Sequence, residues 1–318
     1  MPTYLVTGGS GFIGTTLTRR LVAEGSKVIS LDLKEPRERL PNVDYRVADV
    51  RDLSGFKAGI EVDHIYNFAA VHTTPGHQPY EYYSANVAGA SEITKFAEQN
   101  GVKKITFTSS ISVYGPSEEM KTEGSVPAPQ SDYGHSKLLS EKIHLAWLDR
   151  AADNKLVIVR PAVVFGQGEG GNFTRLAQLL KKGFFIYPGR KNTIKACIYV
   201  EDLINAILFA EAKEDKFVLF NGAYPGRYTL EEIVSVLIKD HFPTAREYMV
   251  PRGAVSSAAT LIKSLGLSKV GIHPERVTKL VRSTDIYPDW LKQNEFQFPE
   301  TLNDVMSRWS RDTKGSFV

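Results

Sequence analysis

Tyr133 and Lys137 stand four residues apart in a stretch that is typical of a helix. On a helix, this spacing puts both side chains on one face, about one turn from each other. A free phenol has a pKa of about 10, so a tyrosinate base at neutral pH requires a shift of about 3 units, which corresponds to about 4 kcal/mol. A neighbouring ammonium group favours the phenolate. The pair therefore predicts a general base at Tyr133 whose pKa is lowered by Lys137, although a helical tyrosine beside an exposed lysine would give the same pattern.

Hydroxyl groups follow the apolar run Lys104–Ser109, where the chain continues Ser110-Ile111-Ser112. Ligands of open α/β sheets bind at the carboxyl ends of the strands. A hydroxyl in this place can hydrogen-bond a reacting carbonyl oxygen. We choose Ser110 for this role, and Ser109 and Ser112 remain alternatives that a turn or a helix cap would also explain.

Three glycines follow the apolar run Tyr4–Thr7 and precede a helical stretch. Gly8 permits a tight turn, Gly11 lets the backbone approach a pyrophosphate, and Gly14 allows close helix packing. The first amides of the helix can bind the anion. Asp32 ends the next apolar run, where its carboxylate can accept a hydrogen bond from a ribose hydroxyl and would repel a 2′-phosphate. The pattern predicts a dinucleotide cofactor, and we expect NAD.

Short apolar runs alternate with amphipathic stretches along the first half of the chain. The strand-like runs are Tyr4–Thr7, Lys27–Asp32, Tyr45–Ala48, His64–Phe68, Lys104–Ser109 and Leu156–Arg160. The helical stretches between them include Phe12–Glu24, Tyr80–Asn100 and Tyr133–Ala151. This alternation predicts an α/β fold with a doubly wound parallel sheet of the Rossmann type, covered by helices on both faces.

The pattern changes after Gly166, where glycine-rich segments and short helical stretches follow, among them Leu230–Asp240 and Ala254–Leu265. We predict a cofactor-binding domain over residues 1–165 and a smaller, mainly substrate-binding region over residues 166–318. Within the second region, about residues 196–212 are expected to return to the first domain. The ending Asp312–Val318 is polar, and we expect it to fray.

Composition excludes several classes of protein. The chain has 318 residues, of which 42% are hydrophobic, so it can bury a large core. Its 39 basic and 36 acidic residues are scattered along the chain, which does not favour nucleic acid binding. We find no run of about 18 apolar residues and no signal segment, so we expect no membrane span and a cytoplasmic protein. The single cysteine, Cys197, excludes an internal disulfide and is expected in the core.

Four motifs resemble those of the extended short-chain dehydrogenase/reductase family: TGGSGFIG at 7–14, SSISVYG at 109–115, YGHSK at 133–137 and IYVEDL at 198–203. Over about residues 3–210 the chain is similar to the NAD-dependent nucleotide-sugar epimerase/dehydratase branch, which includes UDP-glucose 4-epimerase. In such enzymes a tyrosine base and NAD oxidise a sugar hydroxyl to a ketone, which can be reduced again on its opposite face. The resemblance implies that the catalytic residues are Ser110, Tyr133 and Lys137.

The resemblance also implies the binding residues. Those expected to contact NAD are Gly8, Gly11, Phe12, Ile13, Gly14, Asp32, Asp49, Val50, Phe68, Ala69, Ala70, Ser109, Tyr133 and Lys137. Those expected to contact a nucleotide-sugar substrate are Ser110, Ser112, Asn172 and Lys195. Asn86 is expected to brace the central strand. The helices Tyr80–Asn100 and Tyr133–Ala151 are expected to pair across a homodimer.

Departures from the family pattern decide the reaction that we expect. Dehydratases of this branch carry Thr-Asp-Glu where this chain reads Ser110-Ile111-Ser112, so dehydration is not expected. The substrate-contacting asparagine of epimerases, two residues after Arg160-Pro161, is also replaced. We expect a UDP-hexose 4-epimerase type of reaction through a 4-keto sugar. The alternatives are an NAD(P)H-dependent reductase of nucleoside-diphosphate 4-keto sugars and a hydroxysteroid-type dehydrogenase.

Other features leave alternatives open. Lys34 and Arg37 lie close to Asp32 in the sequence, which keeps NADP open as the cofactor. His72 and His77 could contact substrate or only belong to a surface loop. We expect no metal there, because no carboxylate or cysteine accompanies them at ligand spacing.

Overall fold

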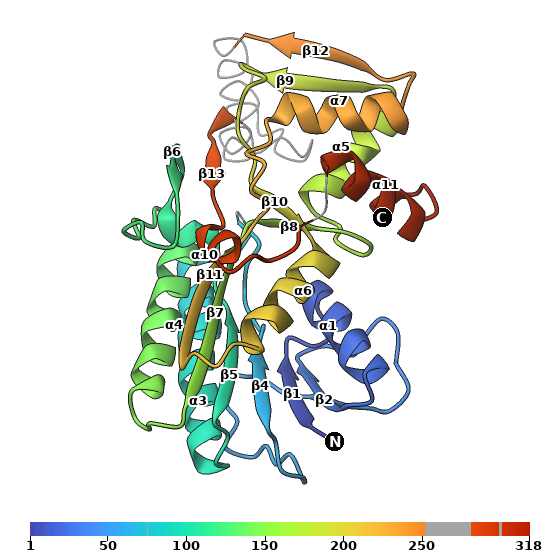
Figure 1. The fold of residues 1–318 in the computed structure, drawn as a ribbon. Helices are drawn as coiled ribbons and strands as arrows, with labels where there is room; N and C mark the ends of the chain where they lie inside the picture. Colours follow the sequence, from blue (N-terminus) through green and yellow to red (C-terminus); the bar gives the residue numbers. More distant parts are fainter. Residues whose placement is uncertain (75, 252–280, 299–300) are drawn as a thin grey trace.

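A seven-stranded sheet forms the core of the lower part of the molecule as drawn in Figure 1. The computed structural model describes residues 1–74, 76–251, 281–298 and 301–318. Neighbouring strands of this sheet are parallel throughout, in the order β11-β7-β5-β4-β1-β2-β3. The strands are β1 (Thr3–Thr7), β2 (Lys27–Asp32), β3 (Val43–Val47), β4 (His64–Asn67), β5 (Lys104–Thr108), β7 (Lys155–Pro161) and β11 (Phe217–Gly222). The predicted α/β fold with a parallel sheet is confirmed.

Helices cover both faces of the sheet. Successive residues of a strand point to opposite faces, and in β7 the pair Val157 and Val159 packs in one hydrophobic cluster while Leu156 and Ile158 pack in another. The first cluster includes side chains of α1 (Phe12–Ala23) and α6 (Val200–Glu211), and the second includes those of α3 (Gly89–Gln99) and α4 (Asp132–Leu148). Burial on both sides is why these strands lack polar alternation.

The strand β11 is absent from the six that the sequence predicts. It pairs with β7 along its whole length, from Phe217 beside Leu156 to Gly222 beside Pro161. Its partner strand, β7, lies about 60 residues earlier in the chain, so a local sequence pattern cannot predict that the two strands pair. The predicted strand Tyr45–Ala48 is also displaced, because β3 begins at Val43.

The predicted helix Tyr80–Asn100 consists of three helical segments. A short helix, α2 (Pro79–Tyr82), passes into one π-helical stretch, η1 (Tyr83–Ala88), before α3 begins. A π turn widens the helix by one residue and often occurs at functional sites. The sequence period predicts the helix but not this change of winding.

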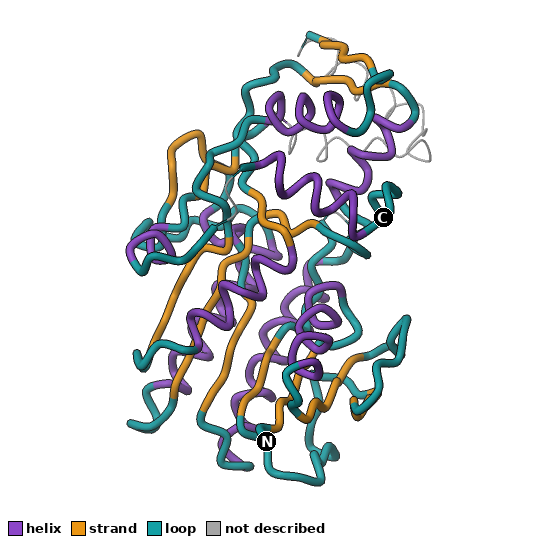
Figure 2. Tube along the Cα trace, turned by 45° about the vertical axis from the view of Figure 1, so that its right-hand side comes forward, coloured by secondary structure: helices purple, strands orange, loops and turns teal. Residues whose placement is uncertain are grey.

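Most of the remaining elements lie beyond the carboxyl ends of the strands, at the top of Figure 1, and Figure 2 shows the same arrangement from another side. They include three pairs of short strands: β6 (Ser117–Lys121) with β13 (Thr284–Ile286), β8 (Val163–Phe165) with β10 (Cys197–Tyr199), and β9 (Phe184–Pro188) with β12 (Arg246–Val250). The helices here are α5 (Asn172–Lys181), α7 (Leu230–Asp240), α10 (Asp289–Gln293) and α11 (Leu302–Asp312). The bounds of α7 are those predicted, and the predicted helix Ala254–Leu265 lies outside the described residues.

The last residues of the chain are anchored, and the expectation that they fray is wrong. The side chain of Phe317 is only 2% exposed, and its ring lies 4.8 Å from that of Trp309. Its backbone N–H donates to Thr313 Oγ1 at 3.0 Å. The single large apolar side chain of this polar segment, Phe317, thus anchors the segment to the core. Cys197 is buried, as predicted, and no helix within the described ranges is long and apolar enough to cross a membrane.

Glu211, the last residue of α6, packs against β4 and β5 of the sheet with 14% of its side chain exposed. Its Oε2 accepts a hydrogen bond from Tyr66 Oη at 2.7 Å, and its Oε1 accepts one from Thr106 Oγ1 at 2.6 Å. His64 Nε2 lies 3.8 Å from Oε1. Burial raises the pKa of Glu211 to about 7, although both hydroxyl donors oppose the shift. Burial also lowers the pKa of His64 to about 3, so Lys104, and not His64, is the cation that opposes the pKa shift of Glu211.

Replacing Glu211 with Gln should change how stability depends on pH. The carboxyl has a pKa of 4.5 when unperturbed and about 7 in the native state. Its contribution to stability is therefore present below about pH 4.5 and is lost as the pH rises through about 7. A shift of this size corresponds to about 3 kcal/mol. In urea denaturation, the free energy of unfolding of E211Q relative to the wild type should rise by up to this amount between about pH 5 and pH 8.5. A difference that stays constant over this range would contradict the assignment.

Candidate active site

Helix α4 carries Tyr133 and Lys137 to the carboxyl end of β5. Ser131 caps the helix by accepting a hydrogen bond from the Gly134 N–H at 3.1 Å. A Cβ on Gly134 would lie only 2.5 Å from the Ser112 carbonyl oxygen, so glycine lets the first turn of α4 pack directly on the backbone after Ser110. This close approach brings the predicted catalytic residues of two separate motifs together.

Tyr133 and Ser110 are in direct contact. A side-chain hydrogen bond from Ser110 acts to lower the pKa of the Tyr133 phenol, but burial has the larger, opposite effect and raises it. The Ser110 hydroxyl also lies 3.1 Å from Ser112 Oγ and accepts the Ser112 N–H at 3.1 Å. Ser110 thus lies beside the predicted general base, and Ser112 orients the hydroxyl of Ser110.

Lys137 is buried, with 1% of its surface exposed. Its Nζ lies 4.3 Å from the centre of the Phe107 ring, a cation–π contact. Burial lowers the pKa of Lys137 to about 7, and the Glu141 carboxylate partly opposes this shift. The pKa of Tyr133 is thus raised by burial, whereas the sequence predicts that Lys137 lowers it. Burial disfavours the charged forms of both groups, and a spacing in the sequence does not show burial.

The glycine loop joins β1 to α1 and has the shape of a phosphate cradle. Gly8 has a φ of +70°, and its Cβ would lie 2.7 Å from the backbone of Ala69. A Cβ on Gly14 would lie 2.2 Å from the Gly8 carbonyl oxygen. A Cβ on Gly11 would approach only this same oxygen, at 3.1 Å. Gly8 and Gly14 are thus required by packing, whereas the exposed Gly11 has a single close neighbour that must move by only a few tenths of an ångström. The first turn of α1, which includes Phe12 and Ile13, has no side-chain cap, so its amides can bind an anion.

Asp32 stands at the carboxyl end of β2, beside the glycine loop. Its Oδ2 accepts the Ser10 N–H at 3.2 Å, and its Oδ1 accepts the Lys34 N–H at 3.2 Å. These bonds hold the carboxylate in place and leave acceptor capacity for a hydroxyl donor. Lys34 and Arg37 are exposed. The loop, the uncapped helix and this carboxylate together fit a dinucleotide.

Three residues predicted to contact the cofactor have partners within the protein. Asp49 accepts hydrogen bonds from Arg51, which lower the pKa of the carboxyl. Val50 belongs to the hydrophobic core. Ser109 donates its hydroxyl to Glu141 Oε1 at 2.5 Å. Phe68, Ala69 and Ala70 follow β4 and are half-buried, and a contact of these residues with the cofactor stays a prediction.

Two predicted substrate residues lie on elements other than those of the catalytic group. Asn172 is exposed at the start of α5. Lys195 Nζ donates to the Arg282 carbonyl oxygen at 2.7 Å. Burial and, to a lesser extent, the Arg190 guanidinium lower the pKa of Lys195 to about 8. A role for these two residues in substrate binding stays a prediction.

The two histidines of the loop after β4, His72 and His77, have different neighbours. His72 hydrogen-bonds the Ala70 carbonyl, and burial and repulsion from Lys137 lower its pKa. His77 Nδ1 lies 3.3 Å from Glu81 Oε1, so it is tied to α2. Of the two, His72 is the one close enough to Lys137 to feel its charge. Within the described ranges, no group of three His, Cys, Asp or Glu side chains could hold a metal ion.

Asn86 has the bracing role that the sequence predicts, although it acts on the chain after β4. Its Nδ2 donates to the Val71 carbonyl oxygen at 3.1 Å and to Ser136 Oγ at 2.9 Å. The Val71 N–H donates back to Asn86 Oδ1 at 2.9 Å. Since Ser136 lies between Tyr133 and Lys137, the brace ties the catalytic turn of α4 to the loop after β4.

The sequence analysis missed a buried ion pair between Glu141 and Arg160. Their side chains are 4% and 5% exposed, and Arg160 Nη2 lies 2.6 Å from Glu141 Oε2. The available signal was the position of Glu141, one helical turn after Lys137 and therefore on the same face of α4.

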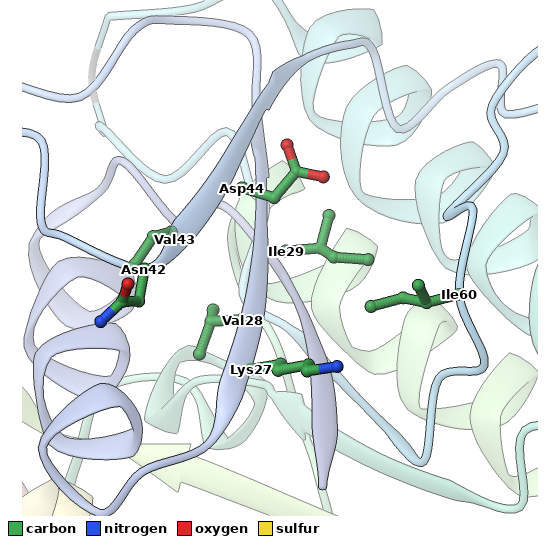
Figure 3. A pocket seen from close by; sticks show the side chains of 7 residues that line it. All are labelled: Lys27, Val28, Ile29, Asn42, Val43, Asp44 and Ile60. Atoms are coloured by element: carbon green, nitrogen blue, oxygen red, sulfur yellow. The ribbon is translucent and has the colours of Figure 1, made fainter. Parts of the chain in front are cut away.

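An open hollow lies away from these residues. Figure 3 shows it at the amino ends of β2 and β3, where it is lined by Lys27, Val28, Ile29, Asn42, Val43, Asp44 and Ile60. None of the predicted site residues lines it. Many of the predicted site residues lie instead at the carboxyl ends of the strands, where such folds bind ligands.

Comparison with known proteins gives consistent matches. The model of the NAD dependent epimerase/dehydratase family matches residues 4–221. The UDP-glucose 4-epimerase of Lactobacillus helveticus is 30% identical over 263 residues, which are 73% of this chain and 79% of that protein. The N-acetyl-alpha-D-glucosaminyl-diphospho-ditrans,octacis-undecaprenol 4-epimerase of Escherichia coli O157:H7 is 31% identical over 207 residues, 64% of this chain and 62% of that protein. The structure of MoeE5 in complex with UDP-glucose and NAD covers 99% of this chain and 100% of its own, with a TM-score of 0.76 and 21% identity, so it shares the fold.

Substitution of Gly11 by Val should weaken NAD binding and leave the fold intact. The added side chain would enter the space where a pyrophosphate approaches, and it meets only the Gly8 carbonyl oxygen. We expect a loss of affinity of at least about tenfold in isothermal titration calorimetry. The matched control, Gly14→Val, should instead lose thermal stability, since its Cβ clashes with backbone. Wild-type NAD affinity in the Gly11 variant would contradict this placement of the cofactor.

Proposed function

The chain belongs to the NAD dependent epimerase/dehydratase family, and on this premise we propose that it is an NAD-dependent epimerase of nucleoside-diphosphate sugars, of the UDP-hexose 4-epimerase type. One observation carries the proposal most directly. Ser110 and Tyr133 are in contact, and Lys137 follows one turn later on the same helix, at the carboxyl end of β5. The relatives named UDP-glucose 4-epimerase support the choice of reaction.

The residues of this chain divide the chemistry between them. When bound, NAD supplies the group that accepts a hydride from the sugar and returns it. The amides of the glycine loop and of the first turn of α1 hold the diphosphate, and the Asp32 carboxylate accepts a hydrogen bond from a ribose hydroxyl. Tyr133 Oη takes the proton of the sugar hydroxyl and later gives it back. Ser110 donates a hydrogen bond to the same sugar oxygen, which fixes its position.

Charge balance decides when Tyr133 can act as a base. Burial raises the pKa of its phenol, and the hydrogen bond from Ser110 lowers it. The ammonium of Lys137 stabilises a developing phenolate, since the two groups lie on one face of α4. Because the pKa of Lys137 is about 7, its ammonium loses its proton at alkaline pH and no longer stabilises the phenolate.

We place the substrate between the two predicted regions of the chain. Residues 1–165 would hold the cofactor, and residues 166–318 would contribute most of the substrate contacts, except for about 196–212. Asn172 and Lys195 are the proposed contacts to the diphosphate of the sugar nucleotide. Lysine offers one point charge and no bidentate fork, so this contact would be less specific than that of an arginine.

We further propose that the protein is a cytoplasmic homodimer. The outer face of α4 exposes Leu139, at 41%, together with Ala146, and Ala88 is exposed at the end of η1. Small and apolar side chains on adjacent helices suit a four-helix contact between two copies. The single, buried Cys197 suits a reducing compartment, and cell fractionation tests the location.

The reaction is tested with purified protein and a panel of UDP-, GDP- and dTDP-hexoses. An epimerase converts one C4 epimer into the other without added NADH, and chromatography of the products measures the conversion. The reductase alternative predicts that a 4-keto sugar is reduced with one NADH consumed per product and that no hexose is interconverted. This outcome would overturn the proposal.

The same assay tests the assigned base. Tyr133→Phe should lower turnover by about 10²–10⁴-fold, the usual contribution of general acid–base catalysis. It should leave NAD binding near the wild-type value. Tyr248→Phe, at an exposed tyrosine on β12, is the matched control and should keep its activity. Full turnover in the Tyr133 variant would exclude this phenol as the base.

The dimer is tested by placing a charge in its proposed interface. Leu139→Asp should yield a monomer in light scattering coupled to size-exclusion chromatography, because a buried unpaired carboxylate is unfavourable. Val126→Asp, at an apolar residue that is 84% exposed elsewhere, should stay dimeric. A monomeric wild type would rule out the dimer.

A further inference from the structure

Behind the catalytic group lies a bidentate ion pair. Arg160 Nε donates to Glu141 Oε1 at 2.9 Å, and Arg160 Nη2 donates to Oε2 at 2.6 Å. Both side chains are almost completely buried. Two parallel bonds of this kind define the relative orientation of the groups as well as their distance. The pair therefore holds α4 and β7 in one arrangement.

This ion pair also holds the chain on both sides of Ser110. The preceding residue, Ser109, donates its hydroxyl to Glu141 Oε1 at 2.5 Å. On the other side, Arg160 Nη1 donates to Tyr114 Oη at 2.8 Å, and the guanidinium lies 4.9 Å from the centre of the Tyr114 ring. Tyr114 ends the short 3-10 helix that begins directly after Ser110. Thus the segment 109–114, which carries Ser110, is fastened at both ends to one ion pair.

Glu141 also has a special place in the surroundings of Lys137. The charged or titratable groups around Lys137 are Tyr133, Glu141 and His144 on α4, His72 after β4, and Arg160 on β7, which pairs with Glu141. Burial lowers the pKa of both histidines, so they are neutral at pH 7. Among these groups of the described chain, the carboxylate of Glu141 is the one that favours the ammonium of Lys137.

We propose that Glu141 is a positioning residue of the active site: it places the hydroxyl of Ser110 through Ser109 and Arg160, and it supplies the counter-charge of Lys137. The inference rests on the proposed function insofar as Ser110 and Lys137 act on a substrate. Glu141 itself contacts neither substrate nor cofactor. It acts through Ser110 and Lys137, so its loss should alter their properties before it alters binding.

The first test measures the titration of Lys137 in Glu141→Gln. Lysines labelled with ¹³C at Cε are followed by NMR, and the signal of Lys137 is assigned by its absence in Lys137→Met. The midpoint should fall by about one pH unit or more in E141Q, because a nearby opposite charge shifts a pKa by 1–3 units. The matched control is E211Q, which removes a largely buried carboxylate on α6, away from Lys137, and should leave the titration of Lys137 unchanged.

The second test uses the epimerase assay on the same proteins. In E141Q the alkaline limb of the kcat profile should move to lower pH by the same amount, and kcat should fall while KM for the sugar nucleotide changes little. A merely structural role would lower the amount of folded enzyme without moving the pH profile. E211Q should keep the wild-type profile.

The outcomes separate the two proposals. A folded E141Q with an unchanged titration of Lys137 and an unchanged kcat overturns the role of Glu141. If E141Q does not fold because Arg160 is left unpaired, Glu141→Gln/Arg160→Gln removes both charges, and its Lys137 must still titrate below the wild-type midpoint. A wild type that converts no sugar nucleotide, but in which E141Q lowers the Lys137 midpoint, defeats the proposed function and retains the role of Glu141.

Discussion

The site depends on keeping charge in a buried place. Lys137 lies under the ring of Phe107, where burial brings the pKa of its ammonium to about 7. Tyr133 is subject to the opposite shift for the same reason, since burial raises the pKa of its phenol. Exclusion of water strengthens every interaction between these groups and at the same time disfavours their charged forms. The contacts around Lys137 and Tyr133 must therefore hold both side chains in position although burial disfavours their charged forms.

Hydrogen bonds and packing contacts from distant parts of the chain hold Tyr133 and Lys137 in place. Gly134 allows α4 to rest on the carbonyl of Ser112. Asn86, in the π-helical stretch η1, joins the loop after β4 to the catalytic turn of α4. Precise placement of this kind matters because a base must lie within hydrogen-bond reach of the proton that it takes.

Two buried carboxylates in this protein differ in their partners. Glu141 meets the guanidinium of Arg160 in a bidentate pair. Glu211 accepts hydrogen bonds from two hydroxyl groups and lies near a neutral imidazole, and burial raises the pKa of its carboxyl to about 7 although the charge of Lys104 opposes the shift. A cation at close range compensates the loss of hydration more fully than hydroxyl groups do. The first carboxylate lies one helical turn from Lys137, and the second lies between the end of α6 and strands β4 and β5.

Local features determined much of this protein from the sequence alone. The spacing of Gly8, Gly11 and Gly14 indicated the phosphate cradle, and the alternation of apolar runs with amphipathic stretches indicated the parallel sheet, because both follow from short-range geometry. Only the tertiary structure decided which strands pair, how α2 passes into α3, and that Glu141 faces Arg160. It also decided the direction of the pKa shift at Tyr133. Each of these depends on burial or on contacts between residues far apart in the chain, and a local sequence pattern predicts neither.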